Sequence, residues 1–330
     1  MEDKPGTLVV SLDFELLWGM RDKHSVADRG PGVLGVRQVI PRLLEAFQEH
    51  GVKATFAAVG LLFFDDKATM ATHLPELRPK YKDKQLSPYE GHLDLVGPDE
   101  VTDPYHFGLS LLRAIQKHPQ HEIACHTFSH YYCLEPGQTE EEFAADLDAA
   151  IMAATPHGIT LRSLVFPRNQ FNSTYLGICL KKGMVCYRGN ESGWLHAPRN
   201  SGQERLFRRA CRLADAWINL SSHHCHLLAA PRNGSPVNIP ASRFLRPWNR
   251  WTAALEPLRA RRITRAMDHA AKTGRVFHLW WHPHNFGMEL ERNMAFLQRI
   301  LGHFDKLRRE QAMRSLTMHE LANEIALRSH

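Results

Sequence analysis

Two short runs of the chain, more than a hundred residues apart, carry side chains that could bind a metal ion. Residues 11–15 read Ser-Leu-Asp-Phe-Glu, and residues 126–130 read His-Thr-Phe-Ser-His. Together they supply two carboxylates and two imidazoles, which is enough for a site in which two histidines and one carboxylate bind zinc or a similar ion. The second carboxylate could then act as a base. A third run, Trp-Trp-His-Pro-His-Asn at residues 280–285, adds a candidate proton donor.

These side chains all follow predicted strands. Short apolar segments that are typical of buried strands precede each run, and another precedes the Phe-Pro-Arg run at residues 166–168. The side chains at or just after the strand ends are Asp13, Glu15, His126, Arg168 and His282. In parallel α/β barrels the chemistry takes place at the carboxyl ends of the strands. We therefore expect these side chains to meet at one rim.

Each part of this constellation also has a purely structural interpretation. His126 and His130 are four residues apart, and in a helical turn this spacing would place both rings on one face. In a chain with 21 histidines, however, such a pair also arises without a metal. A carboxylate such as Asp13 near the end of an apolar strand costs free energy unless it is paired or bound to a metal. Its structural alternative is an ion pair with an arginine, for example Arg168.

The elements that must position these residues alternate between strands and helices, which favours a parallel α/β architecture. Strands are predicted at residues 7–14, 54–59, 121–125, 161–166, 184–187 and 275–281. Helices are predicted up to Gly51 and at residues 108–117, 139–154, 174–182, 205–219 and 252–273, with a loop at the Gly-Pro-Gly run of residues 30–32. We expect one domain over residues 1–330, with insertions at about 64–107 and 221–250 and closing helices at about 290–330.

The composition excludes several classes of protein. The chain is 43% apolar and 23% charged, as ordinary globular proteins are. A net charge of +6 without a clustered basic patch argues against nucleic-acid binding. Neither a signal peptide nor a membrane-spanning segment is predicted. The expectation is a cytoplasmic protein, with a position at the inner face of the membrane as the alternative.

In type and order, the motifs resemble those of the polysaccharide deacetylases with the NodB-homology domain, carbohydrate esterase family 4. Residues 126–130 fit the H-[ST]-x-x-H motif, residues 166–168 resemble a reduced Pro/Arg motif, and Trp281-His282 resembles the late strand that ends in histidine. Asp13-Phe14-Glu15 is similar to the D-x-[DE] motif of a divergent branch, where most members have two adjacent aspartates. The Asp-Trp motif of the family is only loosely matched by residues 215–217. The resemblance spans about residues 7–285.

The resemblance implies a fold and a set of residue roles. The fold would be a distorted (β/α) barrel of about seven parallel strands. A divalent ion, most often Zn²⁺, would be held by Glu15, His126 and His130. Asp13 would be the base, oriented by Arg168, although the roles of Asp13 and Glu15 could be exchanged. His282 would protonate the leaving amine, with His284 as the rival acid. A backbone N–H near Asn169 or Gln170 would meet the oxyanion, and the expected substrate contacts are Asn169, Gln170, Trp281 and His284.

The resemblance also implies a metal-dependent sugar N-deacetylase. A cytoplasmic location favours sugars under construction, so we expect nucleotide- or lipid-diphosphate-linked N-acetyl sugars for bacterial surface polysaccharide, such as lipopolysaccharide. One alternative is another amide hydrolase, such as a deformylase or an allantoinase-like enzyme. A second alternative is a barrel that has lost catalysis and only binds glycan.

Two further segments have competing interpretations. Residues 221–226, Ser-Ser-His-His-Cys-His, could form a second metal site, but no matching second half of a ligand set is apparent, so a histidine-rich loop is favoured. Residues 246–265 contain two tryptophans and six arginines. This segment could contact a membrane surface, clamp a diphosphate, or form a solvated helix whose start is packed by tryptophan.

Overall fold

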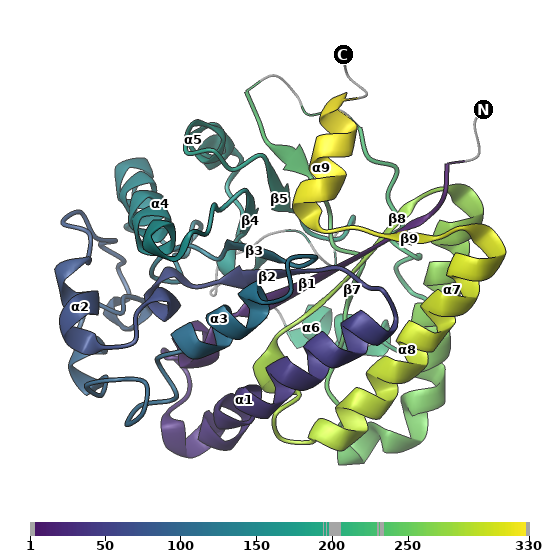
Figure 1. Cartoon of the computed structure of the whole chain (residues 1–330), viewed down its shortest axis with the longest axis horizontal. Coiled ribbons are helices and arrows are strands. Elements are labelled where there is room, and N and C mark those ends of the chain that lie inside the picture. The colour runs from purple at the N-terminus through teal and green to yellow at the C-terminus, as the bar shows by residue number, and fades with distance from the viewer. Residues whose placement is uncertain are drawn as a thin grey trace.

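The computed structural model describes residues 4–193, 195, 197, 206–229, 231 and 234–327. Its centre is a curled parallel sheet in the shape of a half-barrel, with helices around the outside (Figure 1). The order along the sheet is β6-β5-β4-β3-β2-β1-β8-β7, and β9 pairs with β1 beside this path. The expected distorted α/β barrel is thus confirmed, with eight strands along its path instead of about seven.

The strands are β1 (Thr7–Phe14), β2 (Ala54–Ala58), β3 (Glu122–Cys125), β4 (Ser163–Val165), β5 (Cys186–Arg188), β6 (Val237–Asn238), β7 (Arg243–Phe244), β8 (Val276–Trp281) and β9 (Arg314–Ser315). The helices are α1 (Val26–Glu49), α2 (Lys67–Thr72), α3 (Leu109–Gln116), α4 (Glu140–Ala154), α5 (Leu176–Lys181), α6 (Leu206–Ala214), α7 (Glu256–Thr273), α8 (Leu290–Gln311) and α9 (Met318–Leu327). Some positions named in the predictions lie outside the described residues. They are the two ends of the predicted domain (residues 1–3 and 328–330), the predicted helix start at residue 205, and residues 230, 232 and 233 of the second insertion.

The strand β1 is the centre of the sheet, with β2 on one side and β8 on the other. All eight of its residues are buried, because helices cover the outer face and side chains fill the inner one. This explains why its sequence is an almost continuous apolar run. Thr7 and Ser11 are polar, and the one charged residue of the strand is Asp13, which is opposite Ala57 of β2 near its carboxyl end.

The two edges of the curled sheet belong to one short segment, residues 237–244. Strand β6 pairs with β5, and β7 pairs with β8. Between them, Ile239 N–H donates to Tyr187 O and Ser242 N–H donates to His278 O, each at less than 3 Å. One stretch of chain therefore contacts both ends of the sheet and brings β5 and β8 to the same side of the site.

The loop predicted at residues 30–32 is instead part of α1. This helix starts at Val26, where Ser25 and Asp28 form a capping box that offsets part of the cost of Pro31 inside it. Its glycines allow a close approach, not a turn: a Cβ on Gly35 would lie 2.6 Å from the Cα of Gly287. The helix thus packs directly on the segment that follows β8 and carries His284.

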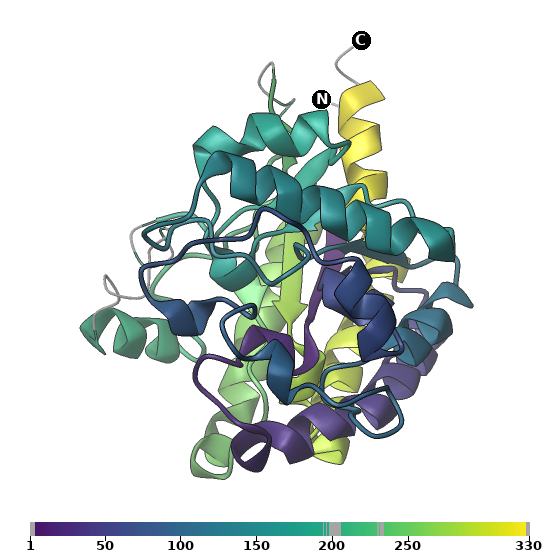
Figure 2. The same ribbon diagram turned by 90° about the vertical axis from the view of Figure 1, so that its left-hand side faces the viewer.

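The first insertion, residues 64–107, contains α2 and short 3₁₀ turns and lies on the side of the molecule that faces the viewer in Figure 2. It is tied to the sheet through polar contacts. Trp18 Nε1 donates to His106 O at 2.7 Å, and Tyr132 N–H donates to the hydroxyl of Tyr81 at 2.8 Å. Within the described residues, no helix is both long and apolar enough to cross a lipid bilayer.

Candidate metal centre and active site

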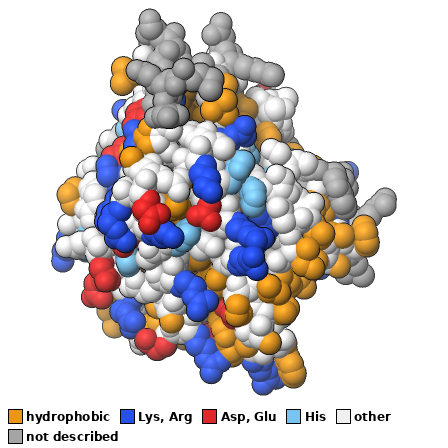
Figure 3. All heavy atoms as spheres, turned by 90° about the vertical axis from the view of Figure 1, so that its right-hand side faces the viewer, with side chains coloured by type: hydrophobic (Ala, Val, Ile, Leu, Met, Phe, Trp, Pro, Cys, Tyr) orange, Lys and Arg blue, Asp and Glu red, His pale blue; other side chains and the backbone are white. Residues whose placement is uncertain are grey.

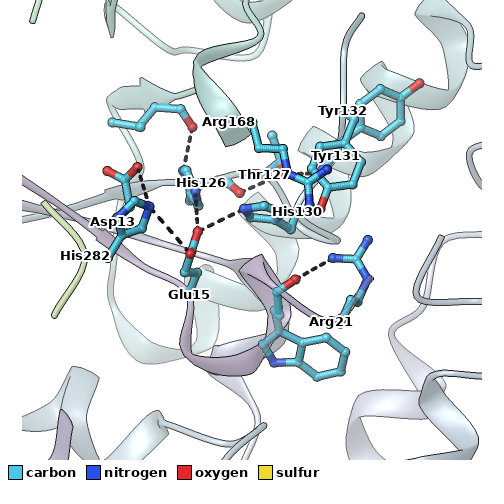
Figure 4. A network of polar contacts seen from close by, with 12 residues as sticks. Asp13, Glu15, Arg21, His126, Thr127, His130, Tyr131, Tyr132, Arg168 and His282 are labelled. Carbon is cyan, nitrogen blue, oxygen red and sulfur yellow. Dashed lines mark hydrogen bonds and ion pairs between the residues drawn. The ribbon is translucent and has the colours of Figure 1, made fainter. Parts of the chain in front are cut away.

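Three predicted metal ligands meet below the rim of the sheet. Glu15 directly follows β1, and His126 and His130 follow β3. The carboxylate Oε2 of Glu15 lies 3.2 Å from His126 Nε2 and 2.9 Å from His130 Nε2. All three side chains are buried, and their ligand atoms lie within 4.8 Å of one another. In Figure 4, dashed lines join the carboxylate of Glu15 to both rings.

The two histidines meet through an irregular loop and not through the helical turn expected from their spacing. Thr127 and His130 adopt left-handed backbone conformations, with φ of 60° and 58°. Such conformations cost about 1 kcal/mol or more in non-glycine residues, so other contacts must hold them. Asp146 of α4 supplies these contacts, because its carboxylate accepts hydrogen bonds from the N–H groups of Phe128 and Ser129 at 2.6 and 3.1 Å.

The chemistry of the donor set fits a cation. His126 Nδ1 lies 2.8 Å from Val165 O, which can only accept, so Nδ1 carries the proton. In neutral His126, Nε2 is then an acceptor, and it faces an acceptor-only carboxylate oxygen of Glu15 at 3.2 Å. A metal ion between these two atoms would satisfy both of them. The hydrogen bond to Val165 O also fixes the ring orientation, as is usual for metal-binding histidines.

The protonation states favour the metal-binding forms. Burial opposes ionisation of Glu15, but His282, His130 and His126 outweigh it and lower the pKa of Glu15 well below its usual value. Burial lowers the pKa of His130 to about 4, against the opposing effect of Glu15. At neutral pH the centre therefore combines an ionised carboxylate with a neutral imidazole at His130.

The second carboxylate, Asp13, is held by an arginine that the sequence did not single out. Arg188, at the end of β5, forms a two-pronged ion pair with Asp13, with N–O distances of 2.6 and 2.8 Å. Both side chains are buried. Burial raises the pKa of Asp13, but the charge of Arg188 and smaller contributions from His282 and His126 lower it overall. Asp13 is therefore ionised at neutral pH.

The expectation that Arg168 orients Asp13 is wrong. Arg168 forms an ion pair with Asp22 at 2.5 Å and lies 4.4 Å above the ring of Tyr132. Figure 4 shows Arg168 beside Tyr132, on the far side of the histidines from Asp13. Both Arg168 and Arg188 follow apolar strands, so their positions in the sequence could not distinguish them. The signal for Arg188 was a charged residue at the end of a predicted buried strand.

His282 lies between the two carboxylates. Its Nε2 is 3.6 Å from Asp13 Oδ2 and 3.6 Å from Glu15 Oε1, and its side chain is 23% exposed. The rival, His284, has its ring centre 5.1 Å from that of His282. Burial, together with the nearby charge of His282, lowers the pKa of His284 to about 3. His284 is therefore neutral at neutral pH and carries no proton to spare for an acid role.

Two predicted substrate contacts are buried and already engaged with other side chains. Trp281 is fully buried, stacked on Phe286 with ring centres 5.6 Å apart, so it cannot contact a substrate. Successive residues of a strand point to opposite faces, and Trp280 lines the pocket in its place. The side chain of Gln170 is buried and donates to Glu135 at 2.8 Å.

The expected oxyanion donors are also occupied. Asn169 N–H donates to Phe166 O at 3.0 Å, and Gln170 N–H donates to Pro167 O at 3.1 Å. Neither backbone group is available to a substrate oxygen in this structure. The side chain of Asn169, in contrast, does lie at the site, because its Oδ1 accepts from Arg188 Nη2 at 3.0 Å and it lines a pocket beside His282.

The histidine-rich segment of residues 221–226 forms no second metal centre. Within the part of the chain that the structure describes, the Glu15, His126 and His130 group is the only cluster of three ligand residues close enough for one ion. His224 Nε2 contacts Ser221 Oγ at 2.7 Å, and His226 Nε2 contacts Ala241 O at 3.0 Å. These rings tie the loop to the domain, as the loop interpretation predicted.

The arginines of residues 246–265 divide into two groups. Arg259 and Arg262 are buried. Arg259 forms an ion pair with Glu256, and Arg262 lies 3.6 Å from Asp215. Arg250, Arg261 and Arg265 are exposed. The segment is therefore neither wholly solvated nor wholly buried.

Comparison with known proteins identifies the family. The family model "Polysaccharide deacetylase" matches residues 25–187. A search of curated proteins found no match. A structure described as a polysaccharide deacetylase from Mycobacterium smegmatis is 16% identical, with a TM-score of 0.61, over 100% of this chain and 93% of the other. One from Pseudomonas aeruginosa PAO1 is 13% identical, with a TM-score of 0.59, over 97% and 91%.

A structure of Puue allantoinase is also similar, with 13% identity and a TM-score of 0.57 over 98% of this chain and 90% of the other. At such low identity these structures show a shared fold and nothing about activity.

Proposed function

We propose that this chain, which belongs to the polysaccharide deacetylase family, hydrolyses the N-acyl group of a sugar, in particular an N-acetyl group, with the help of a divalent metal. Family membership supports sugar deacetylation in general. The observation that carries the proposal for this chain is the arrangement around His282. The Nε2 atom of this ring lies 3.6 Å from Glu15, which belongs to the buried Glu15–His126–His130 group, and 3.6 Å from Asp13, which is paired with Arg188.

The metal fits the donor set of this centre. A divalent ion held by Glu15, His126 and His130, for which zinc is our proposal, would supply Lewis-acid activation of water and of the acyl carbonyl. Val165 O keeps the His126 ring in the orientation that presents Nε2. Asp146 holds the loop between the two histidines.

In this proposal Asp13 is the base and Glu15 the metal ligand. Glu15 is the carboxylate that faces both imidazoles, whereas Asp13 faces Arg188. Asp13 accepts the proton that the attacking water loses, and Arg188 orients it and keeps it ionised beforehand. Ser11 and His278 support Arg188 from behind, because Ser11 Oγ accepts from Arg188 Nη1 and contacts His278 Nε2 at 2.8 Å.

His282 is the proposed acid. Its ring borders the pocket, and its Nε2 lies 3.6 Å from a carboxylate oxygen of Asp13 and 3.6 Å from one of Glu15. It donates a proton to the amine nitrogen as the C–N bond breaks, and the products are an amino sugar and a carboxylate. His284 and Asn285 lie at the edge of the same site, where they line a second pocket with Glu15.

As substrates we propose nucleotide- or lipid-linked N-acetyl sugars used to build bacterial surface polysaccharide, met in the cytoplasm or at the inner face of the membrane. Two features support a contact with a membrane surface. Trp251 is 80% exposed, with Arg250 stacked on its ring at 4.4 Å. On the face drawn in Figure 3, hydrophobic side chains gather next to Lys and Arg side chains.

The test is acetate release from a panel of N-acetyl sugars, with wild type and Asp13→Asn compared on protein of equal metal content. The panel contains nucleotide-linked sugars, lipid-linked sugars and long, diphosphate-free glycans. The proposal expects release from the linked sugars and a large loss in the variant. Cleavage of long glycans alone would overturn the substrate class. Turnover of allantoin or a formamido sugar alone would favour a different amide hydrolase, and a metal-loaded protein inert toward every amide would favour a binding barrel.

A further inference from the structure

A pocket of about 300 Å³ opens beside His282 and has an unusually basic lining. The charged residues that line it are Arg168, Arg212, Arg243, Arg246, Glu191 and Asp215. This volume is at the lower end of the range for small-molecule sites, which suits one sugar unit or a similar group. The pocket thus extends the candidate active site on the side of β7 and β8.

The carboxylate of Asp215 is shared and does not neutralise this lining. Asp215 is buried and forms an ion pair with Arg243, and it also lies 3.6 Å from Arg262. The N–H groups of Leu220 and Ser221 donate to the same carboxylate at 2.9 Å. One negative charge therefore faces two buried arginines, and the two carboxylates that line the pocket, those of Asp215 and Glu191, are outnumbered by its four arginines.

Arg246 is a cation of this pocket that has no ion pair with a described carboxylate. Among the described residues, none places a carboxylate oxygen within 4 Å of its guanidinium, and its hydrogen bond is a long one of 3.4 Å to Arg212 O. Burial and the charges of Arg212, Arg243 and Arg259 lower its pKa. Like charges that surround a half-buried arginine create a positive potential, which a bound anion would relieve.

Aromatic rings separate Arg246 from His282. The rings of Trp280 and Phe244 are 4.7 Å apart, and Phe244 is 5.8 Å from His282. The guanidinium of Arg246 lies 5.8 Å from the centre of the Phe244 ring. The pocket therefore presents, in order, the proposed acid, an apolar wall of two inclined aromatic rings and a cationic end.

We propose that the cationic end of this pocket binds a phosphoryl group of the substrate, with Arg246 as its contacting residue. This rests on the proposed function, because it places the N-acyl group at His282 and the sugar ring on Phe244 and Trp280. A phosphoryl group offers several acceptor oxygens and up to two negative charges. The planar guanidinium of arginine can donate two hydrogen bonds to such a group at once, which it cannot do with a neutral hydroxyl. A nucleotide diphosphate and a lipid phosphate share this chemistry.

The first test measures binding without turnover. Glucose 1-phosphate and methyl glucoside, neither of which has an acyl group, are titrated by calorimetry into the full-length protein. The variants are Arg246→Gln, Arg246→Lys and, as a control, Arg299→Gln on the exposed face of α8. We expect wild type, the lysine variant and the control to bind glucose 1-phosphate at least about tenfold more tightly than methyl glucoside. Arg246→Gln should lose this preference. Equal binding of both ligands by wild type, or an unchanged preference in Arg246→Gln, would overturn the proposal.

The second test separates this proposal from the proposed function and distinguishes the sources of the phosphoryl group. Acetate release is compared for methyl N-acetylglucosaminide, N-acetylglucosamine 1-phosphate, UDP-N-acetylglucosamine and a lipid-phosphate-linked N-acetylglucosamine in detergent. Higher kcat/KM for the phosphorylated sugars, reduced about tenfold or more in Arg246→Gln through KM, supports the proposal. Whichever of the nucleotide-linked and lipid-linked sugars has the higher kcat/KM identifies the source of the phosphoryl group. Equal turnover of all four substrates would contradict the phosphoryl site but uphold deacetylation. If no substrate released acetate while glucose 1-phosphate still bound, only the proposed deacetylation would be contradicted.

Discussion

Residues 126–130 and residues 221–226 contain the same kinds of side chain but differ in what those side chains face. In the first region, two imidazoles point at one carboxylate oxygen of Glu15, which comes from another strand. In the second, each of the three histidines and the cysteine contacts a protein group of its own, such as Ser221 for His224 and Ala241 O for His226. A high density of potential ligands therefore does not make a metal site. The feature that distinguishes a candidate metal site is that several acceptor atoms face one another with no protein hydrogen-bond donor between them.

The largest effect is expected when one of the three candidate metal ligands is removed. His130→Ala should reduce bound divalent metal from near one per chain to near none. It should also lower kcat/KM for acetate release at least about a thousandfold, because several kcal/mol of transition-state stabilisation depend on the ion. Metal is measured by plasma mass spectrometry on gently purified protein. His226→Ala is the matched control and should keep both values. Equal metal in the two variants would show that the two regions do not differ as described.

The next effect tests the buried charge beside the first region. Arg188→Met should lower the free energy of unfolding by about 3–5 kcal/mol, because it leaves the carboxylate of Asp13 buried without its partner. Denaturant titration measures this change. The double variant Arg188→Met/Asp13→Leu removes both charges and should recover a large part of the loss. A double variant with the summed loss of both single variants would contradict a direct coupling between the two side chains.

A third effect concerns a buried histidine that binds no metal in the proposed scheme. Burial, assisted by Arg188, lowers the pKa of His278 to about 3 from 6.5. The folded state therefore keeps this ring neutral while the unfolded chain protonates it. Stability should thus fall as the pH decreases from 6.5, by about 3 kcal/mol at pH 4 from this residue. Unfolding at pH 7, 5.5 and 4 should show a flatter pH dependence for His278→Gln than for wild type. The exposed His73→Gln should leave the slope unchanged, and the same slope in all three proteins would contradict the assignment.

The smallest effect is expected in the second region. His224→Ala removes one hydrogen bond to Ser221, so it should cost about 0.5–1.5 kcal/mol and leave metal content unchanged. Denaturant titration beside metal analysis measures both quantities. A loss of metal in this variant would mean that residues 221–226 contribute to an ion site after all.

The sequence predicted the parts of the site that depend on strand ends and failed where partners come from across the sheet. Strand β1 was recognisable because both of its faces are buried, so its run is apolar up to Asp13. The partner of Asp13 was not, since Arg168 and Arg188 follow neighbouring strands and only the closure of the curled sheet brings Arg188 to Asp13. The start of α1 was missed because Gly-Pro-Gly is typical of a loop. Here the glycines serve the close contact with Gly287.

The position of β1 between β2 and β8 has a consequence for how the protein is made. Thr7 pairs with Val276 on one side, and Val10 pairs with Ala54 on the other. On the ribosome, β2 emerges soon after β1, but β8 and His282 arrive only when most of the chain has been translated. Until then, one edge of the most buried strand has no partner. The three candidate metal ligands all precede residue 131, so a growing chain carries its ion-binding side chains long before its proposed acid. The topology therefore brings the proposed acid to the candidate metal ligands only when synthesis is nearly complete.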